Sequence, residues 1–232
     1  MQYELTILMP CLNEEKSIAF CINEAKEYIL KSKISAEILI ADNGSCDKSV
    51  EIAESLGARV CHIKEKGYGA ALRGGIEKAM GKYIIMGDCD GSYDFLNLDG
   101  FVAKLREGNS LVMGNRFLGG IEKGAMPFHH KYFGVPFLSF FGRLMSGAKV
   151  GDFHCGLRGF ETEAARRLGL SCPGMEFASE IICKFAKSGA RMCEIPTPLR
   201  CDKREGKPHI RSFRDGFRHM KYLVKVKNHI QK

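Results

Sequence analysis

Apolar runs of six or seven residues recur along the first half of the chain, with helical patterns between them. The runs cover residues 5–10, 36–42, 58–63, 82–88 and 110–115, and the helical patterns lie at about 15–31, 47–56, 69–80 and 97–107. Strands that alternate with helices of this length form βαβ units, and strands buried on both faces of a parallel sheet are apolar throughout. The pattern therefore predicts an α/β fold, with an open, mostly parallel sheet and helices on both faces.

The pattern changes after Arg116. Residues 117–150 are rich in Gly, Phe and basic side chains, and no internal repeat or low-complexity linker follows them. The rest predicts a short strand with turns in 151–160, helices near 161–168 and 177–188, a strand in 190–200 and a final helix from about 213. We expect three parts: 1–116, then 117–211 packed onto the same sheet, then a basic amphipathic helix at 212–232.

The composition indicates an intracellular globular protein. With 45% hydrophobic residues among 232, the chain can bury a full core. None of its ten cysteines forms a C-x-x-C pair, which favours free thiols in a reducing cytoplasm over zinc or disulfides. No signal-peptide pattern is evident, and the aromatic stretch at 132–141 is about half of the ~20 residues that span a bilayer. We therefore expect a cytoplasmic protein without a transmembrane helix.

The net charge of +8 is concentrated at the carboxyl-terminal end. Residues 198–232 hold eleven Lys and Arg against three acids, which accounts for the whole excess. Such a segment can meet nucleic acid or an anionic membrane surface. In its last part Phe213, Phe217 and Val224 recur at helical spacing with cations on other faces, and Ser212 is a candidate N-cap. This helix either docks on the core or lies on a membrane surface.

Two aspartates one residue apart, Asp88 and Asp90, directly follow the apolar run that ends in "KYIIMG". Alternate residues of an extended segment point to the same side, so the two carboxylates are expected to share a partner. Mg²⁺ is typically held by one or two carboxylates together with substrate phosphates. The motif therefore favours a divalent-cation site beside a phosphorylated ligand, although a polar loop after a strand has the same short sequence.

Other acids also lie where predicted strands end. Glu14 and Glu15 follow the first run, and Asp42 ends the second. Ligands of open α/β sheets bind outside the carboxyl ends of the strands, where an acid can accept hydrogen bonds from a ribose or a base. We interpret Asp42 as a ligand-binding residue, with turn capping as the alternative, and Asp47 as a residue that opens the next helix through local hydrogen bonds.

The glycine-rich stretch "KGYGAALRGG", at 66–75, is a candidate anion-binding helix start. It fits neither G-x-G-x-x-G nor a P-loop, so a Rossmann dehydrogenase or P-loop enzyme is not expected. Glycines at a helix start still allow backbone N–H groups to approach an anion. Lys66, Gly69 and Arg73 are therefore candidate nucleotide-binding residues, with close packing as the alternative.

The motifs, in this order, resemble family 2 glycosyltransferases, which have the Rossmann-like GT-A fold and use nucleotide sugars. The likeness covers about residues 4–225 and is closest to the polyprenyl-phosphate sugar transferases, which include the dolichyl-phosphate enzymes. It rests on the following stretches: "MPCLNEE", "IADNGSCD", "GYGAALRGG", "GDCDGSYDF", "VMGNRF", "DFHCGLRGF" and "MEFASE".

The resemblance implies an inverting, metal-dependent hexosyltransferase that moves a sugar from a UDP- or GDP-sugar to an acceptor, most simply a polyprenyl phosphate at the cytoplasmic membrane face. Residues 1–116 would then bind the donor and 117–211 the acceptor. Asp88 and Asp90 would hold Mg²⁺ or Mn²⁺, with Asp88 beside the nucleotide and Asp90 also catalytic. Ser92 stands where mannosyltransferases of the subgroup tend to carry Gln, so the donor sugar is not implied.

The resemblance also implies roles for individual residues. Pro10, Asn13 and Glu15 would line the nucleotide while Asp42 reads the base, and Asp152 would orient or deprotonate the acceptor. Cationic residues would bind phosphate or the acceptor: Arg116, Arg158, Arg200, Arg204 and Lys207.

Several alternatives remain open from the sequence. A family 2 enzyme acting on a soluble sugar or peptide hydroxyl lacks a use for the basic loop at 200–211. A nucleotidyltransferase needs a Gly-rich loop where "MPCLNEE" stands. A non-enzymatic nucleic-acid binder explains the basic end only and leaves the acids at the strand ends without a role. We therefore expect an anionic membrane surface, and not nucleic acid, as the macromolecular partner, while the oligomeric state is not predicted.

Overall fold

The computed structural model describes residues 2–204 and 212–228. Within this part of the chain, one seven-stranded sheet has the order β3-β2-β1-β4-β6-β5-β7. Strand β6 is antiparallel to both of its neighbours, and the other pairs are parallel. The strands are β1 Tyr3–Cys11, β2 Ala36–Asp42, β3 Arg59–His62, β4 Gly81–Met86, β5 Leu111–Asn115, β6 Arg158–Glu161 and β7 Met192–Pro196.

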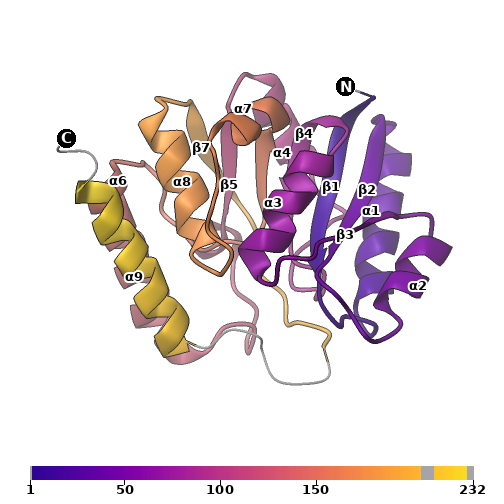
Figure 1. The fold of residues 1–232 in the computed structure, drawn as a ribbon, viewed down its shortest axis with the longest axis horizontal. Coiled ribbons are helices and arrows are strands. Elements are labelled where there is room, and N and C mark those ends of the chain that lie inside the picture. Colours follow the sequence, from indigo (N-terminus) through magenta and orange to yellow (C-terminus); the bar gives the residue numbers. More distant parts are fainter. Residues whose placement is uncertain (1, 205–211, 229–232) are drawn as a thin grey trace.

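Helices cover both faces of this sheet (Figure 1). Helices α3, α7 and α8 lie on one face, α1, α2 and α4 lie on the other, and α6 and α9 pack together beside α8. This arrangement confirms the predicted α/β class. The helices are α1 Ile18–Ser32, α2 Ser49–Ser55, α3 Tyr68–Lys78, α4 Asp99–Arg106, α5 Arg116–Gly119, the π-helix η1 His130–Gly134, α6 Val135–Ser146, α7 Thr162–Arg167, α8 Phe177–Lys187 and α9 Ser212–Asn228.

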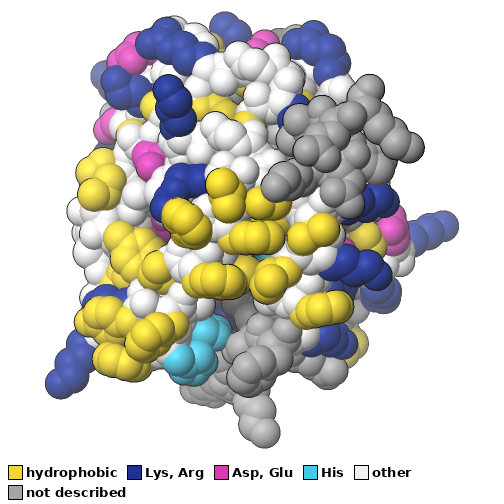
Figure 2. Space-filling model, turned by 90° about the vertical axis from the view of Figure 1, so that its left-hand side faces the viewer, with side chains coloured by type: hydrophobic (Ala, Val, Ile, Leu, Met, Phe, Trp, Pro, Cys, Tyr) yellow, Lys and Arg dark blue, Asp and Glu magenta, His cyan; other side chains and the backbone are white. Residues whose placement is uncertain are grey.

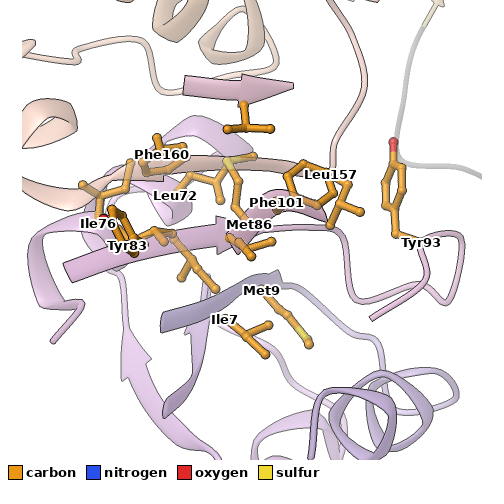
Figure 3. Packing of buried hydrophobic residues seen from close by; sticks show 14 of the residues in the cluster. Ile7, Met9, Leu72, Ile76, Tyr83, Met86, Tyr93, Phe101, Leu157 and Phe160 are labelled. Carbon is orange, nitrogen blue, oxygen red and sulfur yellow. The ribbon is translucent and has the colours of Figure 1, made fainter. Parts of the chain in front are cut away.

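The core forms where side chains of the central strands meet both helix layers. Ile7 of β1 and Met86 of β4 are fully buried, as are Leu72 of α3 and Phe160 of β6. Figure 3 shows these side chains packed around the central strands, with Phe101 of α4 in the same cluster. Because both faces of the sheet are covered, the inner strands read as continuous apolar runs.

The register brings three strand ends to one edge of the sheet. Strand β1 lies between β2 and β4, and its last residue, Cys11, pairs with Asp42 at the end of β2. Strand β4 ends at Met86, so Asp88 and Asp90 lie beyond the strand, in the turn that follows it. The loop after β4 therefore positions both aspartates, and their expected placement on one side of an extended segment stays a prediction.

The second half differs more from the expectation. The sequence predicted no helix in 117–150, yet η1 and α6 follow one another there. Pro136 lies in the first turn of α6, where a missing N–H costs little. Strand β6 inserts between β4 and β5, so the second half completes the sheet of the first. In the described residues, no helix is both long and apolar enough to span a membrane.

Candidate active site

Two acids of the loop after β4 form the centre of the candidate site. Asp90 is buried and Asp88 is half-buried. The Tyr68 hydroxyl donates to Asp88 Oδ1 at 2.9 Å. Ser92 donates to Asp90 Oδ1 through its backbone N–H, at 2.9 Å, and through its hydroxyl, at 2.6 Å. The other oxygen of Asp90, Oδ2, lies 2.9 Å from Nη2 of Arg204, so this carboxylate forms an ion pair with an arginine.

A third carboxylate, Glu14, faces the same guanidinium. Its Oε1 lies 3.4 Å from Nη1 of Arg204. Burial raises the pKa of Glu14 to about 7, although Arg204 acts in the opposite direction. Burial and the neighbouring Asp90 raise the pKa of Asp88 to about 6. These carboxyl groups hold protons more tightly than free ones, and a nearby cation favours their ionised form.

The loops after β1 and β2 are tied together at the same edge. Asn13 Oδ1 accepts from the backbone N–H of Cys46 at 2.8 Å, and the backbone N–H of Glu15 donates to Asp47 Oδ2 at 3.0 Å. Pro10, at the end of β1, lies beside these loops. The structure thus brings Pro10, Asn13 and Glu15 to the edge that carries the two aspartates, and their contact with a nucleotide stays a prediction.

Asp42 makes the turn contacts that the sequence offered as its alternative role. It is 2% exposed and accepts from the backbone N–H of Ser45 and from His62 Nδ1, each at 3.0 Å. Burial acts to raise the pKa of Asp42, but the hydrogen bonds from Ser45 and His62 outweigh it and the pKa is lowered. Asp47 accepts from the backbone N–H of Ser49 at 2.9 Å, just before α2, as predicted. A ligand role for Asp42 stays a prediction.

The glycine-rich stretch is packed against the second half of the chain. A Cβ at Gly69 would lie 2.3 Å from the carbonyl oxygen of Cys172, so only glycine fits there. Lys66 Nζ donates to a backbone carbonyl of the loop after β2 at 2.7 Å. Arg73 pairs with Glu65. Gly69 is therefore closely packed, as the alternative interpretation expected. A nucleotide-binding role for Lys66, Gly69 and Arg73 stays a prediction.

Arg116 and Asp152 form a two-pronged buried ion pair. Arg116 Nε lies 2.7 Å from Asp152 Oδ2, and Nη2 lies 2.8 Å from Oδ1. The aspartate is 0% exposed and the arginine 8%. The backbone N–H groups of Arg116 and His154 also donate to Asp152, each at 3.2 Å, so its buried carboxylate already accepts four hydrogen bonds from the protein. Its expected role as a base stays a prediction.

Arg158 lies inside the protein. It is 1% exposed, and its guanidinium donates to the carbonyl oxygens of Cys155 and Ala178, each at 2.9 Å. This burial leaves almost none of the guanidinium for a phosphate, which corrects the expected contact. The physical reason is that β6 inserts into the sheet and carries Arg158 into the layer beneath α8.

Residues 197–204, here called the strap, run from β7 across the loop that carries the aspartates. The backbone N–H of Arg200 donates to the carbonyl oxygen of Ser92 at 2.9 Å, and that of Lys203 donates to the carbonyl oxygen of Asp90 at 2.7 Å. Two backbone hydrogen bonds therefore hold the strap against the loop that carries the two aspartates.

The cations of the strap bind acids of the first half. Arg200 lies 2.7 Å from Glu24 and 2.9 Å from Asp94. The structure thus brings Arg200 and Arg204 to the predicted site, where both are paired with carboxylates. Lys207 lies outside the described residues, and its predicted role is not tested.

Sequence reasoning missed the two tyrosines of the site. Besides Tyr68, the hydroxyl of Tyr93 accepts from the backbone N–H of Gly156 at 2.6 Å, and in Figure 3 its hydroxyl points away from the apolar cluster. Both lie inside the motifs quoted for the family resemblance, "GYGAALRGG" and "GDCDGSYDF". Their position next to the aspartates depends on the fold, so no periodicity or charge pattern marked them.

Comparison with protein-family models gives a match over residues 6–169 to the model described as "Glycosyl transferase family 2". The matched range includes every loop at the carboxyl ends of β1, β2 and β4. The chain belongs to glycosyl transferase family 2. The predicted family is therefore confirmed.

Relatives within family 2 cover most of this chain. It is 40% identical over 222 residues to a low-salt glycan biosynthesis hexosyltransferase of Haloferax volcanii, in a match that covers 95% of this chain and 53% of that protein. The chain thus spans about half the length of that relative. It is also 28% identical to a dolichyl-phosphate hexose transferase of the same organism, with 96% of this chain and 93% of that protein covered.

Among solved structures, the fold is similar to that of glucosyl-3-phosphoglycerate synthase from Mycobacterium tuberculosis, determined with Mn²⁺, uridine diphosphate and phosphoglyceric acid. The TM-score is 0.75 at 19% sequence identity, over 97% of this chain and 78% of that one. This likeness confirms the predicted GT-A fold of the family.

The family resemblance implies a divalent cation, and the carboxylate pair suits one. No group of three or more His, Cys, Asp or Glu side chains that could hold a metal occurs in the described part of the chain. Two carboxylates completed by substrate phosphates are, however, a common Mg²⁺ site. Asp88 and Asp90 supply such oxygens, and the guanidinium on Asp90 is itself a cation at that place. The residues therefore fit Mg²⁺ or Mn²⁺ held jointly with a donor diphosphate.

Proposed function

We propose that this family 2 enzyme transfers a hexose, with inversion, from a nucleotide-diphosphate sugar to a polyprenyl phosphate at a membrane surface. The observation that carries the lipid acceptor is an apolar surface on the side of the molecule formed by η1, α6 and α9 (Figure 2). Its side chains, here called the aromatic face, are each 46–70% exposed: Phe128, Tyr132, Phe133, Phe137, Phe140, Leu144, Phe217 and Val224.

The aromatic face has the character of a membrane-binding surface. Soluble monomers rarely expose large contiguous apolar patches, and a basic amphipathic helix suits an anionic lipid surface. Helix α9 adds exposed cations beside its apolar residues, namely Arg214, Lys221 and Lys225. Charge and apolar area thus favour anionic lipid as the partner of this face.

A short segment leads from the aromatic face to the candidate active site. Helix α6 packs on Phe153, whose backbone N–H donates to Ser139 Oγ at 3.2 Å. The following residues reach the aspartates, since a Cβ at Gly156 would lie 2.6 Å from Asp88 Oδ2. An acceptor anchored in the bilayer by its lipid chain would therefore have its phosphate near the edge of the sheet that carries the acids.

The chemistry suits an acceptor that is already anionic. A phosphate monoester has a second pKa near 6, so it needs no strong base, and attack on the sugar carbon opposite the leaving diphosphate inverts that centre. The cation, when bound, would offset the charge that builds on the leaving diphosphate. Asp88 and Asp90 would hold it, while the strap arginines Arg200 and Arg204 are the candidate groups to orient the acceptor phosphate. The dolichyl-phosphate relative supports this choice of acceptor class.

Transfer of labelled sugar tests the proposal directly. The full chain, with Mn²⁺ or Mg²⁺, is incubated with a panel of UDP- and GDP-sugars and with polyprenyl phosphate in detergent or in vesicles. We expect label in the organic-extractable fraction for at least one donor. Transfer only to phosphoglyceric acid or to a soluble sugar would contradict the lipid acceptor, and no transfer from any donor would contradict the activity.

Vesicle binding tests the aromatic face separately. Changing Phe137→Ser together with Phe140→Ser should weaken co-sedimentation with anionic vesicles by about tenfold or more, because burying each ring is worth roughly 1.5–3 kcal/mol. Leu30→Ser on α1 is the matched control, since Leu30 is 76% exposed on a helix away from the face. Equal binding of the double variant and the control would contradict a membrane role for the face.

A further inference from the structure

Both oxygens of Asp90 contact neighbouring protein groups. Ser92 holds Oδ1 with two hydrogen bonds, and Arg204 Nη2 holds Oδ2 at 2.9 Å. Each carboxylate oxygen offers about two lone-pair sites, so the two bonds from Ser92 fill Oδ1, whereas the single contact from Arg204 leaves a site on Oδ2. A divalent cation on Asp90 would therefore bind through Oδ2, directly beside the Arg204 guanidinium, and the repulsion between the two cations favours only one of them at that oxygen.

Arg204 also stands at the centre of the negative charge at this edge. Its guanidinium lies 2.9 Å from Asp90, 3.4 Å from Glu14 and 3.3 Å from the exposed Asp202. The first two are buried acids of the first half, and Asp202 belongs to the strap itself. Like-charged groups this close need a counter-cation, and among the described side chains within ion-pair distance of Asp90, Arg204 supplies it.

We propose that Arg204 is a built-in counter-cation that holds the place of the divalent metal, so that metal binding at Asp90 and the Arg204–Asp90 pair exclude one another. This inference rests on the metal site of the proposed function. Once displaced, Arg204 keeps Asp202 as a partner at the rim of the site, where its guanidinium is free to meet a substrate phosphate. Metal binding at Asp90 would thereby release the Arg204 guanidinium to bind a substrate phosphate.

The strap has the anchors that such an exchange requires. Arg200 is tied to Glu24 and Asp94, which are not metal ligands in the proposed site. The backbone hydrogen bond from Lys203 to the Asp90 carbonyl does not use the carboxylate. The strap can therefore stay in place while only the side chain of Arg204 turns away from Asp90.

Direct titration with Mn²⁺ tests this exchange without donor or acceptor. Free Mn²⁺ is measured by electron paramagnetic resonance with the full chain as wild type, Arg204→Gln and Arg204→Lys. We expect Arg204→Gln to bind Mn²⁺ at least tenfold more tightly than the wild type, and Arg204→Lys to stay closer to the wild type because it keeps the charge. Lys104→Gln, which removes one positive charge from a pair with Glu107 on the surface of α4, is the matched control and should not change the Kd.

A second measurement uses the unaltered protein, in case Arg204→Gln does not fold. Phenylglyoxal modifies accessible guanidinium groups, and peptide mass spectrometry reports the rate at Arg204. We expect Mn²⁺ to accelerate modification at Arg204, with Arg106, paired with Glu4 on the surface, as the internal control. An unchanged rate at Arg204 with Mn²⁺ bound would overturn the exchange.

The outcomes separate this inference from the proposed function. Equal Mn²⁺ affinity in the wild type and Arg204→Gln overturns the exchange and leaves sugar transfer untouched, since transfer is assayed on its own. Absence of Mn²⁺ binding to every variant, also with uridine diphosphate present, overturns the metal site and the exchange with it.

Discussion

Two arginine–aspartate pairs of this molecule use the same side chains in different surroundings. Arg116 donates to Asp152 through two nitrogens, at 2.7 and 2.8 Å. The Arg116 side chain is 10% exposed and the Asp152 side chain 0%. Arg204 touches Asp90 with one nitrogen at 2.9 Å, and its side chain is 21% exposed. The first pair lies between α5 and the segment under α6, whereas the second lies at the open edge of the sheet.

This difference indicates which pair can change partners. A bidentate pair away from water loses two charge-assisted hydrogen bonds at once when it opens, and it has no solvent to replace them. A single contact near solvent, with Glu14 and Asp202 as alternative partners, opens at less cost. We infer that the Arg116–Asp152 pair stabilises the second half, while the Arg204–Asp90 pair responds to ligands.

The largest expected effect is on stability at the buried pair. Arg116→Ala should lower the free energy of unfolding by about 3–5 kcal/mol, because Asp152 is left as an unpaired buried charge. Arg204→Ala should cost about 1 kcal/mol or less, as expected for a pair near solvent. Urea unfolding followed by circular dichroism measures both, and equal losses would remove the distinction between the two pairs.

Next in size is the effect on activity at the open pair. Asp90→Asn and Asp88→Asn should each reduce kcat by about 10²- to 10³-fold, because the charge that stabilises the leaving diphosphate is no longer held. Both should stay folded, since the asparagine oxygen can still accept the hydrogen bonds from Ser92 or Tyr68. Turnover is measured with labelled donor, and full wild-type activity in EDTA would show that the carboxylates act in another way.

A smaller effect is expected at Asp152 when a lipid phosphate is the acceptor. A positioned base contributes typically 10²- to 10⁴-fold, but an ionised phosphate has no proton to give up. Asp152→Asn should therefore cost less than about 10²-fold in kcat when assayed at a temperature where the variant is folded. A loss of about 10³-fold or more in kcat, with the variant still folded, would mean that Asp152 acts directly as a base and would contradict the inference from its burial.

The smallest effect concerns pH and the third acid of the open edge. The folded-state pKa of Glu14, about 7, lies above its ordinary value of 4.5, so the folded protein binds this proton more tightly than the unfolded chain. The free energy of unfolding contributed by Glu14 therefore falls as pH rises from about 4.5 to 7 and then levels off.

Glu14→Gln should remove this dependence. The difference in unfolding free energy between wild type and variant should change by about 3 kcal/mol at most over the window, because the pKa rises by about 2.5 units and one unit corresponds to about 1.4 kcal/mol; solvent screening at the open edge reduces this figure. Urea titrations at a series of pH values without metal measure it. A difference that stays constant with pH would mean that Glu14 is not buried beside Arg204 as described.

The sequence determined the first half closely because its information is local. The apolar runs at 36–42 and 110–115 became β2 and β5 with nearly the same bounds, since strands covered on both faces must be apolar along their length. Acids placed after such strands had to meet at one edge, because parallel strands end together. Asp88 and Asp90 were therefore found from the sequence, although the turn that holds them was not.

The second half was decided by the tertiary structure, because its partners lie far apart in the chain. Aromatic and glycine residues in 128–146 gave no clear helical signal, yet α6 forms there and packs on α8 and α9. Insertion of β6 buried Arg158, Asp152 pairs with Arg116 across 36 positions, and the strap that follows β7 lies over Asp90. The local sequence shows which side chains are charged. The free energy of burying a charge, however, depends on the partner that the chain topology places beside it. An arginine with a buried, bidentate partner is structural, whereas one with a single partner near solvent can bind a ligand.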